Sequence, residues 1–242
     1  MTRIYVNLPL AVDVRIELPE RAGRHVAQVL RMRAGELLTL FNGAGGEYRA
    51  VIETVERHSV KVRVEDFHEV ERESALALTL AQCVSRGERM DYSLQKAVEL
   101  GVAAVVPLLS SRGVVRLDEE RWDKKLEHWR GVMVAACEQS GRNRIPALAP
   151  VQKLGDWLQV PTTGETARLV LAPGGAHRLH ELPPAKTVTL LVGPEGGLAD
   201  EEAALAVRRG FTAVSLGPRV LRTETAGVAA LAALQALWGD LS

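Results

Sequence analysis

The segment 187–237 constrains the fold most, because it contains one pattern twice: a β-prone run, a loop rich in Gly and Pro, and a stretch able to form a helix. The β-prone runs are 188–192 and 212–216, followed by the loops GPEGG (193–197) and LGPRVLRTETA (216–226). Loops between a strand and a helix collect free backbone amides and helix N-termini, which is where α/β proteins usually bind ligands. The pattern therefore predicts a ligand site in an α/β domain.

The chain from residue 75 onward continues this alternation of strands and helices. Buried strands are predicted at 76–82, 102–108 and 168–172, and helices at 90–100 and 121–140, where apolar residues recur close to the helical period. Strands that alternate with helices imply a parallel sheet with helices on its faces.

Residues 1–72 are different, with several short β-prone runs and one helical stretch at 25–30. The turn at 42–46 (NGAGG) is a strong hairpin signal, because Asn and Gly tolerate positive φ. Closely spaced strands predict a small barrel or sandwich. The charged stretch 68–74 suggests a boundary, so we expect one domain over 1–72 and another over 73–242.

Composition excludes several classes of protein. No apolar run approaches the roughly 20 residues that span a bilayer, and the first residues lack a signal-peptide pattern. Cys83 and Cys137 form no CxxC pair and fit a reducing cytoplasm, while His177 and His180 lack a third ligand at metal spacing. We expect a cytoplasmic protein with no membrane partner and no metal. The zero net charge (30 basic against 30 acidic residues) leaves a local nucleic-acid patch open.

The GPEGG loop is neither a P-loop, because no GK[ST] follows it, nor a GxGxxG fingerprint, so a nucleoside triphosphate or NAD is disfavoured. A plain turn explains this loop alone about as well as a ligand site does. Two such loops on consecutive strands, with Arg219 and Arg222 at their rim, favour a shared pocket. Asp200 and Thr223 are the expected N-caps of the two following helices.

Four ordered motifs together resemble the SPOUT class of S-adenosylmethionine-dependent RNA methyltransferases, specifically the 16S ribosomal RNA uridine-N3 methyltransferase family. They are HVAQVLRMRAGELLTLFNGAGGEY (25–48), LQKAVELGVAAVVP (94–107), CEQSGRNRIP (137–146), and GPEGG followed by LGPRVLRTETA. The sequence departs from the family pattern at Ala199, where Ser or Thr is usual, and at Arg86, where lysine is expected.

The resemblance implies an N-terminal PUA-like β-barrel that binds RNA and a SPOUT parallel sheet with a C-terminal trefoil knot. It also implies a homodimer, for which the small residues 227–233 of the last helix would allow close approach, and methylation of a specific uridine of 16S ribosomal RNA in the small subunit. S-adenosylmethionine would be the methyl donor. Residues implied to bind it are Leu171, Ala172, Gly193, Gly196, Gly197, Leu216, Val220, Leu221 and Arg222.

Arg222 is the expected catalytic residue, as a cation near the uracil oxygens, and Glu138 is the second candidate, as a proton acceptor or base-positioning residue. Residues expected to contact RNA are Arg3, His25, Arg31, Arg33, Arg142 and Arg144. Taken singly, each of these is better explained by an ordinary surface or helix-end role. Two alternatives remain open: another SPOUT activity (2′-O or guanine-N1 methylation of transfer RNA), and an RNA-binding module without catalysis.

Overall fold

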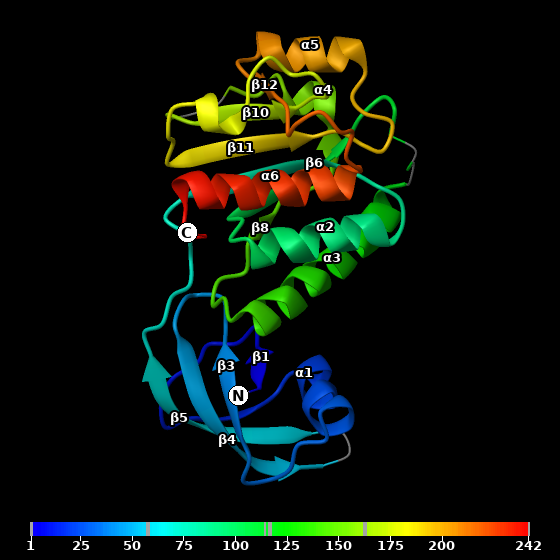
Figure 1. Ribbon diagram of the computed structural model, residues 1–242. Helices are drawn as coiled ribbons and strands as arrows, with labels where there is room; N and C mark the ends of the chain where they lie inside the picture. Colours follow the sequence, from blue (N-terminus) through cyan, green and yellow to red (C-terminus); the bar gives the residue numbers. More distant parts are fainter. Residues whose placement is uncertain (1, 57–58, 114, 116–117, 162–163, 242) are drawn as a thin grey trace. The chain divides into compact units, whose positions relative to one another are not determined.

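The chain divides into two compact units in a computed structural model that describes residues 2–56, 59–113, 115, 118–161 and 164–241 (Figure 1). The first unit combines Met1–Glu73 with Cys137–Ile145, and the second combines Ser74–Ala136 with Pro146–Ser242. The return of the chain to the first unit at Cys137–Ile145 has no signal in the sequence pattern.

The first unit is a five-stranded sheet in the order β1-β3-β4-β5-β2, in which β1 and β3 are parallel and the other neighbours antiparallel. Its elements are β1 (Arg3–Tyr5), β2 (Arg15–Glu17), α1 (Glu20–Arg24), a π-helical turn (His25–Val29), β3 (Leu37–Phe41), β4 (Glu47–Val55) and β5 (Val60–His68). Alternation places Val60, Val62 and Val64 of β5 in the core beside Leu38 and Leu40. Irregular register between β4 and β5 bends these long strands.

The second unit is built on a fully parallel sheet in the order β12-β10-β11-β6-β7-β8, with β9 also paired to β7. Its strands are β6 (Ala77–Cys83), β7 (Ala104–Leu109), β8 (Ala147–Leu148), β9 (Gln152–Lys153), β10 (Ala167–Leu171), β11 (Thr187–Val192) and β12 (Thr212–Val214). The predicted parallel α/β sheet is confirmed. Leu78 and Leu80 of β6, and Leu190 and Leu191 of β11, are buried, as expected for central strands.

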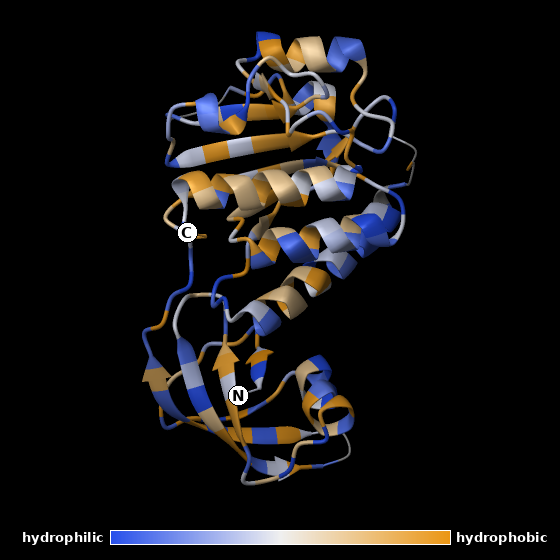
Figure 2. Ribbon diagram, viewed as in Figure 1, coloured by the Kyte–Doolittle hydropathy of each residue, from blue (hydrophilic) through white to orange (hydrophobic). Residues whose placement is uncertain are grey.

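Helices cover this sheet: α6 packs on α2, β6 and β11, whereas α5 packs on α4 and β10 (Figure 1). The helices of the second unit are α2 (Glu88–Glu99), α4 (Leu154–Trp157), a 3-10 turn (Leu179–Glu181), α5 (Asp200–Arg208) and α6 (Thr223–Trp238); α3 (Glu119–Ser140) starts there and ends in the first unit. Figure 2 shows α6 largely in hydrophobic colours, which fits its burial against α2 and the sheet. Among the described residues, no helix has the length and apolarity needed to cross a bilayer.

The starts of α5 and α6 differ from the prediction by one residue. Ala199, not Asp200, precedes α5, and its backbone N–H donates to the Glu202 carboxylate at 3.0 Å, as in half of a capping box. Arg222, not Thr223, precedes α6, and the Thr223 side chain is buried. Both predicted N-caps are therefore wrong: at α5 the local bond from Ala199 to Glu202 sets the start, and at α6 the Thr223 hydroxyl donates to the distant Gly193 carbonyl instead.

Candidate functional site

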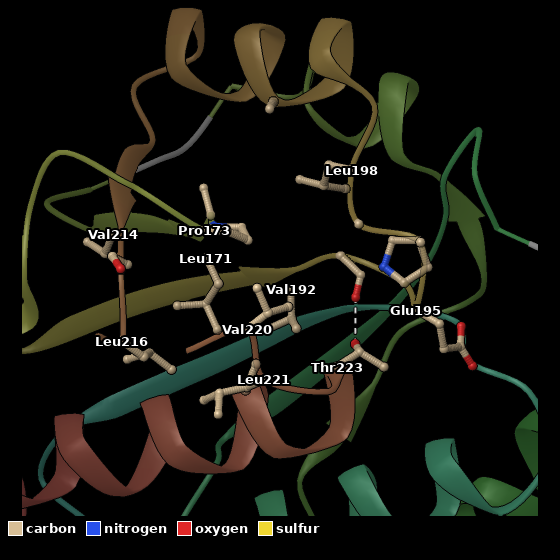
Figure 3. Close-up of a pocket in the computed structure, with 18 of the residues that line it drawn as sticks. Leu171, Pro173, Val192, Glu195, Leu198, Val214, Leu216, Val220, Leu221 and Thr223 are labelled. Carbon is tan, nitrogen blue, oxygen red and sulfur yellow. Dashed lines mark hydrogen bonds between the residues drawn. The ribbon is translucent and has the colours of Figure 1, made fainter. Parts of the chain in front are cut away.

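A cavity of about 430 Å³ lies at the carboxyl ends of β10, β11 and β12 (Figure 3). Most of its lining comes from three segments: 171–173, 192–198 and 214–223, the last without Pro218 and Arg222. Since parallel strands end at the same edge of the sheet, the two Gly/Pro loops of the sequence pattern meet the end of β10 here.

Backbone packing within the first loop requires glycine at its start. A Cβ on Gly193 would lie 3.0 Å from the backbone nitrogen of Leu198 and 3.2 Å from its Cγ. Gly197 has a φ of 68°, which is strained for other residues, and its N–H donates to the Pro194 carbonyl at 2.9 Å. The loop is thus folded tightly on itself, and its backbone forms one wall of the cavity.

A buried polar chain fastens this loop to the start of α6. The Thr223 hydroxyl donates to the Gly193 carbonyl at 2.6 Å, and the Gln82 amide nitrogen lies 3.1 Å from the same hydroxyl oxygen (Figure 3). Gln82, at the end of β6, is fully buried. Gln82 was not predicted as a site residue; a polar residue in the apolar run LALTLAQC is the signal that could have found it.

Glu195, the acidic residue of GPEGG, holds a neighbouring loop rather than facing the leucines of the cavity (Figure 3). Its carboxylate accepts the Arg86 backbone N–H and the Arg89 guanidinium, each at 3.0 Å. Burial alone would raise the pKa of Glu195. Hydrogen bonds from its own backbone N–H and from the Arg86 backbone N–H, together with the Arg89 guanidinium, outweigh burial and lower the pKa below 4.5. Glu195 is therefore ionised at neutral pH and fixes the segment after β6.

The walls of the cavity are mainly aliphatic. Leu171, Val192, Leu198, Leu216 and Leu221 supply most of the large side chains (Figure 3). Among the described residues, the backbone N–H groups of 216 and 221 have no acceptor, so they are available to a ligand. Apolar walls with a few free polar groups are typical of a small-molecule site.

The hydroxyl and thiol groups near this cavity are not activated as nucleophiles. The two hydroxyls of the lining already donate to carbonyls: Ser215 to that of Gly217, and Thr223 to that of Gly193. Cys83 is not in the lining, and burial raises the pKa of its thiol to about 12.

All of the predicted cofactor residues except Arg222 line this cavity. They are Leu171, Ala172, Gly193, Gly196, Gly197, Leu216, Val220 and Leu221. Arg222 lies between two lining residues, Leu221 and Thr223, but its own side chain is exposed. Within the described part of the chain, that guanidinium has no hydrogen-bond or ion-pair partner, so its charge is available.

Glu138 lies in the first unit and not in the lining of the cavity. Its carboxylate accepts the backbone N–H of Tyr5 at 2.9 Å and so ties the end of α3 to β1. This hydrogen bond gives Glu138 a structural role in the first unit and does not support a role as proton acceptor.

The arginines predicted to bind RNA fall into two groups, of which the first is already paired with carboxylates. Arg3 pairs with Glu47, Arg142 with Glu73, and Arg144 with Glu71. The first two are nearly buried, with 12% and 4% of their side chains exposed. Burial favours a higher pKa for Glu47, but the arginines beside it, Arg3 and Arg72, lower the net value. These pairs hold the first unit together, so direct RNA contact by Arg3 or Arg142 is disfavoured.

Arg31 and Arg33 form the second group: both are exposed and, among the described residues, free of ion pairs. They lie between the π-helical turn and β3 beside the exposed Val29 and Leu37. His25 is half-buried within that turn. The predicted RNA contacts of Arg31 and Arg33 are compatible with this exposure and stay predictions.

Comparisons with known proteins agree with this geometry. The model of the RNA methyltransferase domain matches residues 72–235, and that of the RNA methyltransferase PUA domain matches 18–65. Ribosomal RNA small subunit methyltransferase E of Buchnera aphidicola (Schizaphis graminum strain) is 34% identical, over 99% of this chain and 98% of that protein.

Two solved structures are similar over nearly their full lengths. A methyltransferase from Legionella pneumophila with bound S-adenosylmethionine is 44% identical, with a TM-score of 0.96 and 99% of each chain covered. Ribosomal RNA small subunit methyltransferase E from Neisseria gonorrhoeae bound to S-adenosyl methionine is 40% identical, with a TM-score of 0.92 and full coverage of both chains.

Proposed function

This chain belongs to the RNA methyltransferase family whose members include ribosomal RNA small subunit methyltransferase E, and from that premise we propose that it methylates N3 of a specific uridine in 16S ribosomal RNA with S-adenosylmethionine. The observation that carries the proposal is the cavity at the ends of β10, β11 and β12. The two solved structures with bound S-adenosylmethionine are 44% and 40% identical to this chain.

The cavity fits S-adenosylmethionine in size and chemistry. Its volume of about 430 Å³ is in the range of small-molecule sites. Leu216 and Leu221 would pack their aliphatic side chains against the flat adenine, and their unpartnered backbone N–H groups would be free to donate to it. Gly193, Gly196 and Gly197 let the backbone approach closely.

The bound sulfonium supplies an activated methyl group, so this chain must align donor and acceptor and exclude water. The new bond joins the methyl carbon to N3 of the uridine, while the carbon–sulfur bond breaks and the N3 proton leaves. Negative charge spreads over the uracil oxygens as that proton is lost. The unpaired guanidinium of Arg222, next to the lining residue Leu221, is suited to stabilise this charge.

A trefoil knot in the second unit is part of the proposal and is supported by the path of the chain around β12. Val214 pairs with Leu171 of β10 on one side and bridges His177 on the other. The connecting segment crosses β12 so closely that a Cβ on Gly175 would be 2.8 Å from the Val214 carbonyl carbon. That segment then returns to β11 on the far side of β10.

The remaining parts of the proposal concern assembly and location. We propose RNA binding by residues 1–72, methyl transfer by 73–242, a homodimer and a cytoplasmic location. Gly227 and Ala230 are buried by packing within the chain, whereas Ala229, Ala232 and Ala233 of α6 keep part of their surface exposed for a second copy.

Two measurements test the proposed function. Titration calorimetry should show S-adenosylmethionine binding, and small ribosomal subunits that lack the modification should accept labelled methyl from it. Absence of binding would revive the reading of an RNA-binding module without catalysis. Label in transfer RNA but not in small subunits would redirect the proposal to another substrate.

A further inference from the structure

A second cavity, of about 380 Å³, adjoins the first along the loops that follow β10 and β12. The residues that line both cavities are Pro173, Ser215, Gly217, Arg219 and Val220. The residues that line only the second are Gly174, Gly175, Ala176, Arg178, Glu181 and Pro218. A ligand here would therefore lie beside whatever occupies the first cavity.

The second cavity has a net positive lining. Its charged residues are Arg178, Arg219 and Glu181, so the lining carries two guanidinium groups and one carboxylate. Both arginines are exposed, and within the described residues neither side chain has an ion pair or hydrogen bond. The Glu181 carboxylate accepts the backbone N–H of Arg178 at 2.9 Å, which commits one of its oxygens.

The loop after β10, which supplies residues 173–176 and 178 of this lining, is held in place. Gly175 donates its N–H to the Ala172 carbonyl at 3.0 Å and lies directly against the backbone of β12. Among the described residues, the backbone N–H groups of Gly174 and Ala176 have no acceptor. Free backbone donors and two unpaired guanidiniums are the groups that bind an anion, and guanidinium suits phosphate in particular.

We propose that this second cavity binds a phosphate of the RNA strand that carries the target uridine, with Arg178 and Arg219 as its ligands. The inference rests on the proposed function. A base that receives a methyl group from the first cavity must bring its own sugar-phosphate backbone close to that cavity. An anion could also come from the methionyl carboxylate of S-adenosylmethionine, and the experiment separates these two sources.

The primary test is Arg178→Ala, because Arg178 lines the second cavity and not the first. The apparent Kd of small ribosomal subunits is measured by fluorescence anisotropy of the labelled protein at several salt concentrations, and the Kd of S-adenosylmethionine by calorimetry. Loss of a charge-assisted contact should weaken RNA binding roughly tenfold, and the slope of log K against log salt should fall by about one. The affinity for S-adenosylmethionine should be unchanged.

Matched variants show whether position matters. Arg208→Ala removes an exposed arginine of α5 that lines neither cavity, and it should leave RNA binding unchanged. Arg178→Lys keeps the charge without the bidentate geometry and should recover part of the affinity. Arg219→Ala should weaken RNA binding as Arg178→Ala does.

Two results would overturn the inference. If Arg178→Ala weakened S-adenosylmethionine binding and not RNA binding, the anion would be the methionyl carboxylate. If it changed neither, or no more than Arg208→Ala, the cavity would bind no anion of the reaction. Failure of the proposed function would give a different result: the protein without any substitution would transfer no methyl group to RNA. The binding assays do not depend on that activity.

Discussion

The Thr223 hydroxyl donates a 2.6 Å hydrogen bond to the Gly193 carbonyl and so joins two loops that lie 30 residues apart. The Gln82 amide donates to the same hydroxyl oxygen, which connects the end of β6 to both loops. Because these groups are buried, the bonds fix the relative position of two walls of the cavity.

Replacing Thr223 with valine tests this connection. Thr223→Val keeps the shape of the side chain but leaves the Gly193 carbonyl without its donor and the Gln82 amide nitrogen with only the Cys83 carbonyl as acceptor. The free energy of unfolding should fall by about 1–3 kcal/mol, and S-adenosylmethionine should bind more weakly. Urea denaturation and calorimetry measure these effects. Thr225→Val, on the exposed side of the same helix, is the control, and equal effects in both variants would contradict the account.

Gly193→Ala should damage the cofactor cavity through backbone displacement. The new Cβ would lie 3.0 Å from the Leu198 backbone nitrogen, so the loop must shift and affinity for S-adenosylmethionine should drop. Gly155→Ala is the matched control, since a Cβ there meets nothing within 4 Å and the residue lies in α4. That control should keep full affinity and be neutral or more stable by up to about 1 kcal/mol. Unchanged calorimetric Kd for Gly193→Ala would refute the close packing.

Glu195 should make stability depend on pH in the acidic range. Its pKa is lower in the folded chain than the ordinary 4.5, so the ionised form stabilises folding. That contribution is complete above about pH 4.5 and is lost as pH falls through the folded pKa. Glu195→Gln should therefore lower stability at neutral pH and flatten its decline in acid. Urea denaturation at a series of pH values measures both, and an unaltered pH profile would rule out this role.

The two thiols should be inert while the chain is folded. Burial raises the pKa of Cys83 and of Cys137 to about 12, so little thiolate exists at neutral pH. A thiol-specific reagent should label neither residue in buffer and both in denaturant. Mass spectrometry counts the labels, and rapid labelling of the folded chain would contradict the burial seen here.

Arg222→Ala should lower kcat with little change in the Kd of S-adenosylmethionine. Loss of one preorganised donor to a developing oxyanion typically costs roughly 100-fold, and Arg222→Lys should keep part of the rate. Single-turnover methylation at saturating RNA and S-adenosylmethionine measures this step. Full activity of Arg222→Ala under those conditions would show that another group stabilises the uracil anion.

Periodicity predicted the strands and helices of the second unit because these patterns are local. It also predicted the position of the cavity, because parallel strands all end at the same edge of the sheet. Nothing local could reveal that Arg3 and Arg142 are held by Glu47 and Glu73, because these partners lie 44 and 69 residues away. Thr223 shows the same limit: its preference for an N-cap is local, but the Gly193 carbonyl that captures its hydroxyl is not.

The most direct test of the central claim is the identity of the methylated nucleoside. Small ribosomal subunits lacking the modification are incubated with this protein and labelled S-adenosylmethionine, and the digested 16S ribosomal RNA is analysed by mass spectrometry. The account predicts a single labelled product, 3-methyluridine. Label in a 2′-O-methylated nucleoside or in methylguanosine would contradict it.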